Sequence, residues 1–298
     1  FTQIASTTVS SSLPVSLSFQ ELEENKPSSR AVGPSPISLE DFRRLQAEIE
    51  PASVLVDGHG TGLLRPSDED RKLYFTIEPS TVSKAVLPEV VDNSSSKFFP
   101  PCGDQGPAGL CVAFSSAYYI MTYEMAREHG WDISSVQWQA SSSGGTVSDG
   151  THIMSPAFTY HLINGGRDNG ATYADAQDLL SKIGSCTWAL MGKEDVYQTS
   201  SFSLPSSEAF LQASDCRLSD ADPQIRLIRV KDMADIAAIC SCLNDGWCLS
   251  LSIDAGMLYC SFNSKAVMVG SFNDFGSNHA QTVVGYIQGQ AWQDYLAK

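Results

Sequence analysis

The chain has 298 residues, and its 34 Asp and Glu outnumber its 19 Lys and Arg, which gives a formal charge of −15 at pH 7. Such a charge repels phosphate backbones and anionic lipid, and no basic run offsets it, so the composition argues against nucleic-acid and membrane-surface roles. Apolar residues make up 42% of the chain, enough for a hydrophobic core, and no uninterrupted apolar window reaches the roughly 18 residues of a membrane-spanning helix.

The first part of the chain predicts little regular structure. Residues 1–36 are rich in Ser and Pro and indicate a loosely structured arm. A capping residue at Ser38, followed by apolar residues at helical spacing, predicts a short helix over 38–50. Short apolar runs then predict strands over 54–56 and 72–77.

The composition changes near residue 95, and this change divides the chain into two predicted regions. We expect residues 1–95 to form an N-terminal arm and small region, and residues 96–298 to form the main domain. The Ser- and Thr-rich stretch that begins at Phe1 is typical of the sequence after a cleaved signal peptide. It predicts a secreted or extracytoplasmic protein.

The main domain opens with a loop that leads into a long buried helix. Pro100 and Pro101 favour an extended entry, and a glycine-containing loop follows. From Cys111 onward, apolar residues recur at i, i+3, i+4, i+7, i+8 and i+11: Phe114, Ala117, Tyr118, Met121, Thr122 and Met125. Gly130 ends this pattern, so we predict a helix from Cys111 to just before Gly130.

Helices come first and strands later in the rest of the domain. The pattern predicts helices from Pro156 to Gly165 and over Thr172–Ile183 and Asp232–Asn244, and strands over Trp247–Ile253 and Ala280–Ile287. This order is typical of an α+β fold.

The residues around Cys111 form a pattern with a chemical meaning. A thiol at the N-terminus of a helix is stabilised as thiolate by the helix dipole, which lowers its pKa. Gln105, six residues earlier, and the backbone N–H groups of the glycine-rich loop are donors of the kind that form an oxyanion hole. His279, at the start of a predicted strand, is the candidate base.

These motifs resemble those of the papain-like cysteine peptidases, the family of papain and the cathepsins. Gln105, Cys111 and the run His279-Ala280, which precedes a Val-rich strand ending in Gly285-Tyr286, carry the resemblance, and features after Ser155 look most like the microbial branch. The resemblance covers about residues 98–298. It implies a two-lobed fold, with Cys111 on the central helix of a helical lobe and His279 in a β-rich lobe.

The resemblance also implies the residues that bind substrate. Gly170 and Ala171 match the glycine-containing segment that pairs with the substrate backbone. The full set of candidate substrate-binding residues is Gly109, Leu110, Asn169, Gly170, Ala171, Asn278 and Ala280. Residues 1–95 occupy the position of a prosegment, and the helix over 38–50 either covers the cleft or, as we favour, braces the domain.

The chain departs from the family pattern at several positions. Ala108 replaces the cysteine that forms a disulfide next to the nucleophile, Leu110 replaces a small polar residue, and Val112 replaces the usual aromatic residue. Cys111 and His279 are 168 residues apart, more than the roughly 130–150 of the family signature, so we predict polar, loop-like insertions over 137–150 and 199–222.

A further departure concerns the residue that orients the histidine. No Asn-Ser-Trp-Gly motif follows His279, and Tyr295-Leu-Ala-Lys298 resembles the strand that leads into that motif. We therefore expect a further C-terminal segment of the same polypeptide to supply the Asn. If none does, the imidazole lacks its orienting group.

The sequence thus predicts a cysteine endopeptidase that acts on protein or peptide substrates, with no metal or organic cofactor. The alternatives are a catalytically silent papain-fold binding or zymogen-like protein, and a Cys-His acyltransferase or transpeptidase. A zinc site among the cysteines is disfavoured, because Cys240 and Cys242 fall on different faces of one predicted helix. No motif pairs Asp57, Asp168 or Asp294 as a glycosidase requires. The other histidines, His59 included, are assigned structural roles.

Overall fold

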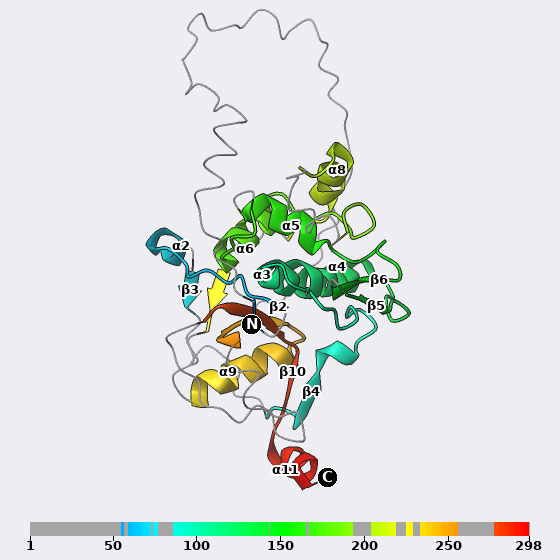
Figure 1. Ribbon diagram of the computed structural model, residues 1–298. Helices are drawn as coiled ribbons and strands as arrows, with labels where there is room; N and C mark the ends of the chain where they lie inside the picture. The colour runs from blue at the N-terminus through cyan, green and yellow to red at the C-terminus, as the bar shows by residue number, and fades with distance from the viewer. Residues whose placement is uncertain are drawn as a thin grey trace, which may run out of the picture. The chain divides into compact units, whose positions relative to one another are not determined.

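The computed structural model describes residues 55–56, 59–72, 74–76, 86–142, 144–164, 167–192, 204–218, 225–228, 233–255 and 277–297 (Figure 1). The chain divides after Ile49, and every described residue belongs to the unit that spans 50–298. The boundary that the sequence predicts near residue 95 falls inside this unit. The predicted arm over 1–36 and helix over 38–50 lie outside the described residues.

The described residues form helices and short strands. The helices are α2 (Asp68–Lys72), α3 (Cys111–Ala113), α4 (Thr122–His129), α5 (Pro156–Ile163), α6 (Tyr173–Lys182), α8 (Ser207–Asp215), α9 (Met233–Asn244) and α11 (Gly289–Ala297). The strands are β1 (Leu55–Val56), β2 (His59–Gly60), β3 (Tyr74–Thr76), β4 (Val90–Asp92), β5 (Trp138–Ser141), β6 (Gly144–Val147), β7 (Ile225–Leu227), β8 (Leu249–Ile253), β9 (His279–Val283) and β10 (Gly285–Ile287). No helix among these described residues is both long and apolar enough to cross a membrane.

A continuous helix runs from Cys111 to His129, as the sequence predicts. It consists of α3, a π-helical stretch over Phe114–Met121, and α4. Every residue of the predicted apolar stripe is buried, because the 3.6-residue period places the stripe on one face against the core. Gly130 ends the helix in a left-handed conformation, with φ of 70°.

Helices α5 and α6 pack against this central helix (Figure 1). Ser155 caps α5 by accepting a hydrogen bond from Phe158 N at 3.0 Å. Thr172 and Asp175 form a reciprocal capping box at the start of α6. Both helix starts agree with the sequence prediction. The loop between the two helices is thereby fixed at both ends, and it carries Asp168 to Ala171.

The pairing of β8 with β9 fixes His279 in space. The strands are antiparallel, with Ile253 opposite His279 and Leu249 opposite Val283. The hydroxyl of Ser115, on the central helix, lies 3.0 Å from the carbonyl oxygen of Gln281, to which it donates, and 3.0 Å from the hydroxyl of Thr282. This buried contact joins the helix that begins at Cys111 to the strand that begins at His279.

Two stretches predicted as loops prove to be regular. Residues 137–150 contain the hairpin β5–β6, in which Trp138 pairs with Val147. The ring of Trp138 packs edge-on against Phe114, Tyr118 and Trp188, so tertiary contacts stabilise a segment whose Ser and Gly content suggests a loop. Residues 199–222 contain α8, which Ser206 caps and which buries Ala209 and Ala213 at helical spacing.

The resemblance of residues 295–298 to a strand is also wrong, because Gly289–Ala297 is the helix α11. The carboxylate of Glu89 accepts hydrogen bonds from Gln290 N at 3.1 Å and Ala291 N at 2.9 Å. This cap comes from a residue about 200 positions away, so no local pattern predicts the helix.

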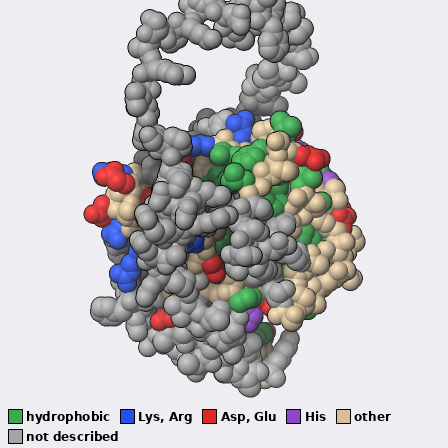
Figure 2. All heavy atoms as spheres, turned by 45° about the horizontal axis from the view of Figure 1, so that its top comes forward, with side chains coloured by type: hydrophobic (Ala, Val, Ile, Leu, Met, Phe, Trp, Pro, Cys, Tyr) green, Lys and Arg blue, Asp and Glu red, His purple; other side chains and the backbone are tan. Residues whose placement is uncertain are grey.

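On the face drawn in Figure 2, basic and acidic side chains lie interspersed at one edge.

Candidate active site

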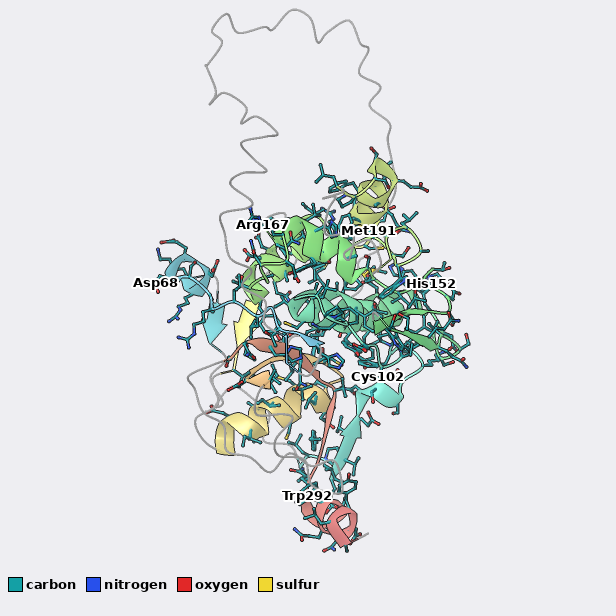
Figure 3. The ribbon with its side chains drawn as sticks, viewed as in Figure 1. Asp68, Cys102, His152, Arg167, Met191 and Trp292 are labelled. Carbon is teal, nitrogen blue, oxygen red and sulfur yellow. The ribbon has the colours of Figure 1, made fainter. Side chains whose placement is uncertain are left out.

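The loop that precedes Cys111 is held by its own backbone and by neighbours. Leu110 N donates to Ala108 O at 2.8 Å, and Gly106, with φ of 69°, donates through its N–H to Asp104 Oδ1 at 2.7 Å. No side chain caps α3 at Leu110, so the first N–H groups of the helix remain for other acceptors. Cys111 follows directly and is fully buried. In Figure 3, Cys102 marks the start of this loop.

His279 stands at the first position of β9, which packs against α3. Its Nδ1 atom is buried and has no hydrogen-bond partner among the described residues. The backbone N–H of the next residue, Ala280, faces the Cys111 thiol. The fold therefore brings the two predicted catalytic residues to one place, but no hydrogen bond joins them in this state.

A stretch of the chain's own N-terminal region covers this place. The covering segment, residues 59–64, runs extended past the loop before Cys111 (β2 in Figure 1). Gly60 N donates to Gly106 O at 3.0 Å, and the Gln105 side-chain amide donates to Gly60 O at 2.7 Å. The N–H of Gly62 faces the thiol of Cys111. The predicted oxyanion donor thus already holds a peptide carbonyl.

The covering segment also pairs with the predicted substrate-binding segment, Gly170 and Ala171, which we call the wall; the loop over 167–171 that carries it is the wall loop. Ala171 N donates to Gly62 O at 2.8 Å, and Leu64 N donates to Ala171 O at 2.9 Å, in the pattern of a parallel bridge. On the opposite side, Leu63 N donates to Asn278 O at 3.0 Å. A backbone in extended conformation is therefore held by backbone groups on both sides, as a bound peptide would be.

Glycines make this close approach possible. A Cβ atom at Gly62 would lie 2.1 Å from Gly109 O, and one at Gly60 would lie 2.2 Å from Ala108 O. On the wall, Gly170 has φ of 78°, and a Cβ atom there would lie 2.3 Å from Gly62 O. Any other residue at these positions clashes with backbone atoms that have no room to move.

Burial sets the protonation state of the predicted catalytic pair. It raises the pKa of the Cys111 thiol from 9.0 to about 11, although N–H groups of Ala280 and Gly62 oppose the rise. Burial and the nearby His59 lower the pKa of His279 from 6.5 to about 4. The thiolate predicted from the helix dipole is therefore absent near pH 7 in this state, because desolvation outweighs the dipole.

His59 belongs to the site, although the sequence assigned it a structural role. Its Nδ1 lies 3.2 Å from Asp104 Oδ1, and both side chains are partly exposed. Asp104 Oδ1 also accepts the Gly106 N–H. This contact therefore attaches the start of the covering segment to the loop that carries Gln105.

The remaining predicted residues contribute mainly through the backbone. The Leu110 side chain is fully buried in the core, and Gly109 N donates to Asp168 Oδ1 at 2.7 Å. Asn278 accepts a hydrogen bond from Ala255 N at its side-chain oxygen, so its carbonyl is the group that faces the covering segment. Asn169 is partly buried in the wall loop.

The sequence carries a signal for the covering segment that the prediction missed. Gly60 and Gly62 alternate with His59, Thr61 and Leu63. In an extended strand this alternation leaves one face without side chains, which suits a backbone that must lie flat against another.

A cavity of about 820 Å³ adjoins the same site and is bounded in part by Gln105 and His279.

Comparisons with known proteins bear on the fold. Neither the protein-family models nor the sequences of curated proteins give a match. Digestive procathepsin L2 proteinase of Tenebrio molitor larval midgut is similar in structure, with 14% identity, a TM-score of 0.52, and coverage of 85% of this chain and 75% of that one. Digestive procathepsin L 3 of the same source has 13% identity, a TM-score of 0.50, and coverage of 84% and 73%. The chain has the papain-like fold.

Xylellain, a cysteine protease from Xylella fastidiosa, is 19% identical over 78% of this chain and 83% of its own, with a TM-score of 0.49. The papain-like α+β fold agrees with the fold class predicted from the sequence. Among the described residues, no group of three or more His, Cys, Asp or Glu could hold a metal ion.

Proposed function

We propose that the protein is a cysteine endopeptidase and that the structure represents its closed, zymogen-like state. Cys111 is the nucleophile, His279 is the base, and Gln105 is an oxyanion donor. The observation that carries the proposal is the covering segment itself. An extended peptide lies across the thiol, bound by backbone hydrogen bonds to Ala171 and Asn278 and by the Gln105 amide.

In the open state the reaction would follow from these positions. Once water reaches the site, the proton of Cys111 passes to His279, and the thiolate attacks the carbonyl carbon of the substrate. Gln105 Nε2 and the Cys111 N–H stabilise the oxyanion that forms. His279 then protonates the leaving amine as the C–N bond breaks, and water hydrolyses the thioester while His279 accepts its proton. The cavity beside His279 and Gln105 gives space for the leaving part of the substrate.

The covering segment escapes cleavage because of what it presents to the nucleophile. The thiol faces the N–H of Gly62, whereas the carbonyl held by Gln105 belongs to Gly60. On this proposal the segment is not attacked by sulfur, because the carbonyl at the oxyanion donor lies two residues before the residue that faces the thiol. Burial of the thiol keeps it protonated, although the Gly62 N–H by itself favours the thiolate.

Hydrolysis of an unfolded protein such as casein tests the proposal in the variant Gly62→Val. A Cβ atom at this position would lie 2.1 Å from Gly109 O, so the substitution should displace the covering segment and open the site. Cys111→Ser and His279→Ala, each added to Gly62→Val, should each reduce the rate at least about 10³-fold. The matched control is Cys216→Ser, because Cys216 is also buried and its pKa is also raised by burial. Hydrolysis that survives Cys111→Ser contradicts the proposal.

The same assay separates the other candidate functions. Added amines should not divert the products into amides, as they would with an acyltransferase or transpeptidase. A protein that binds peptide but hydrolyses none in the opened variant would be the silent papain-fold protein. Substrates are proposed to be proteins or peptides that the enzyme meets outside the cytoplasm.

A further inference from the structure

The loop before the nucleophile carries the oxyanion donors, and its internal hydrogen bonds, such as those that Leu110 N and the Gln105 amide donate to Ala108 O, fix its shape but not its position relative to Ala171. Gly106, Pro107, Ala108 and Gly109 have no side-chain hydrogen-bonding groups. In the open state the covering segment would leave, and the contacts of Gly60 with Gly106 and Gln105 would leave with it. Something else must then keep the loop in register with the wall at Ala171.

Asp168 connects the loop before Cys111 directly to the loop that carries Gly170 and Ala171. Its Oδ1 accepts the backbone N–H of Gly109 at 2.7 Å, across 59 residues of sequence. Asp168 lies on the wall loop between α5 and α6, two residues before Gly170. In Figure 3, Arg167 marks this loop. A carboxylate accepts such a hydrogen bond more strongly than a neutral group does.

Tyr160 completes the connection from inside the core. Its side chain is fully buried on α5, and its hydroxyl donates to the same Asp168 Oδ1 at 2.5 Å. The hydroxyl oxygen in turn accepts the N–H of Gly170 at 3.0 Å. Burial, and then the nearby Asp168 and Cys111, raise the pKa of Tyr160, so the network lies close to the nucleophile.

We infer that Asp168 and Tyr160 are positioning residues, which fix the oxyanion-hole loop to the substrate wall through Gly109. The inference rests on the proposed peptidase function. From the sequence, Asp168 is weighed as a glycosidase acid and as the first residue of the segment that resembles a substrate-binding wall; in the structure its Oδ1 accepts hydrogen bonds from Gly109 N and the Tyr160 hydroxyl. The network acts in both states, because none of its members belongs to the covering segment.

Hydrogen–deuterium exchange tests the connection without any assay of activity. Asp168→Ala removes the acceptor, so exchange across residues 104–111 should rise at least about tenfold in rate. Asp168→Asn keeps an oxygen that can accept both bonds and should stay within about threefold of the natural protein. Tyr160→Phe, which keeps the ring, should raise exchange at Gly109 and Gly170 and serves if Asp168→Ala fails to fold.

Kinetics in the Gly62→Val background then test the consequence. Asp168→Ala should lower kcat by about 10- to 100-fold with a smaller change in KM, because a displaced donor mainly weakens the transition state. Asp168→Asn should recover most of kcat. The control is Asp149→Ala, which removes a carboxylate that accepts the Thr151 N–H in a turn elsewhere.

Two results would overturn the inference: unchanged exchange in Asp168→Ala, or equal losses of kcat in Asp168→Asn and Asp168→Ala. Failure of the proposed function looks different. In that case Gly62→Val with Asp168 intact hydrolyses nothing, while the exchange measurement still decides whether the connection exists.

Discussion

The position of Cys111 in the fold was predictable from the sequence, but the protonation state of its thiol was not. The sequence places it correctly at the start of a buried helix, because the apolar stripe begins there and the glycine-rich loop ends there. The backbone N–H groups of Cys111 and Val112, at the start of the helix, lower the pKa of the thiol, in the direction that the helix dipole predicts. The size of the opposing desolvation could not be predicted, because it depends on how deeply the folded chain buries the thiol.

The shifted pKa values of Cys111 and His279 predict the pH range of greatest stability. The folded pKa of Cys111, about 11, exceeds its ordinary 9.0, so the folded state binds more protons and stability is lost as pH rises from 9 to 11. The folded pKa of His279, about 4, is below its ordinary 6.5, so the unfolded state binds more protons and stability is lost as pH falls from 6.5 to 4. The closed state should be most stable between these ranges.

Urea denaturation at pH 5, 7.5 and 10 measures this profile. His279→Gln should flatten the acid side and Cys111→Ser the alkaline side, relative to the natural protein, because other groups titrate equally in all three. The comparison between pH 7.5 and pH 5 decides the assigned shift of His279. If the natural protein gains stability over this range and His279→Gln gains it equally, the assigned shift is wrong.

Elements were predictable where their signals are local. The helix that begins at Cys111 has an apolar period and ends at Gly130, and the helices after Ser155 and Thr172 begin at local side-chain caps; all three occur. Helix α11 is capped by Glu89, and the hairpin β5–β6 is held by Trp138 against distant aromatic rings. These elements depend on contacts that only the folded chain supplies, so the sequence pattern could not show them.

The start of α6 gives a quantitative test at this scale. Thr172→Ala removes the side-chain half of the capping box, next to the wall residue Ala171, and should lower the free energy of unfolding by about 1 kcal/mol. Thr172→Ser keeps the hydroxyl and should lower it by less than half as much. Chemical denaturation at pH 7.5 measures both, and equal losses would show that the cap is not the cause.

The covering segment predicts how the site opens. Gly62→Val cannot be accommodated, because its Cβ would lie 2.1 Å from Gly109 O, so the segment should be displaced. Solvent then reaches Cys111, its pKa falls, and alkylation by iodoacetamide at pH 7.5 should accelerate at least about tenfold. Gly130→Val is the control, since it strains the end of α4 with nothing within 4 Å of the new Cβ. Similar acceleration in the control would indicate general loosening instead.

At the scale of the whole molecule, the order of helices and strands predicted the α+β class, and the motifs at Gln105, Cys111 and His279 predicted the papain-like fold that the structure has. The segment around Gly60 and Gly62 was assigned to a small N-terminal region. Its place across the nucleophile follows from long-range pairing with Ala171 and Asn278. Backbone pairing of this kind leaves little trace in side-chain patterns, so only the folded chain reveals it.

One measurement tests the central claim, that residues 59–64 close a peptidase whose nucleophile is Cys111. The full chain and Gly62→Val are incubated with an epoxysuccinyl thiol inhibitor, the modified residue is mapped by mass spectrometry, and casein hydrolysis is followed in parallel. We predict slow labelling and little hydrolysis in the natural chain, and rapid labelling of Cys111 together with inhibitor-sensitive hydrolysis in the variant. A variant in which Cys111 becomes accessible and labelled but casein stays intact would contradict the claim.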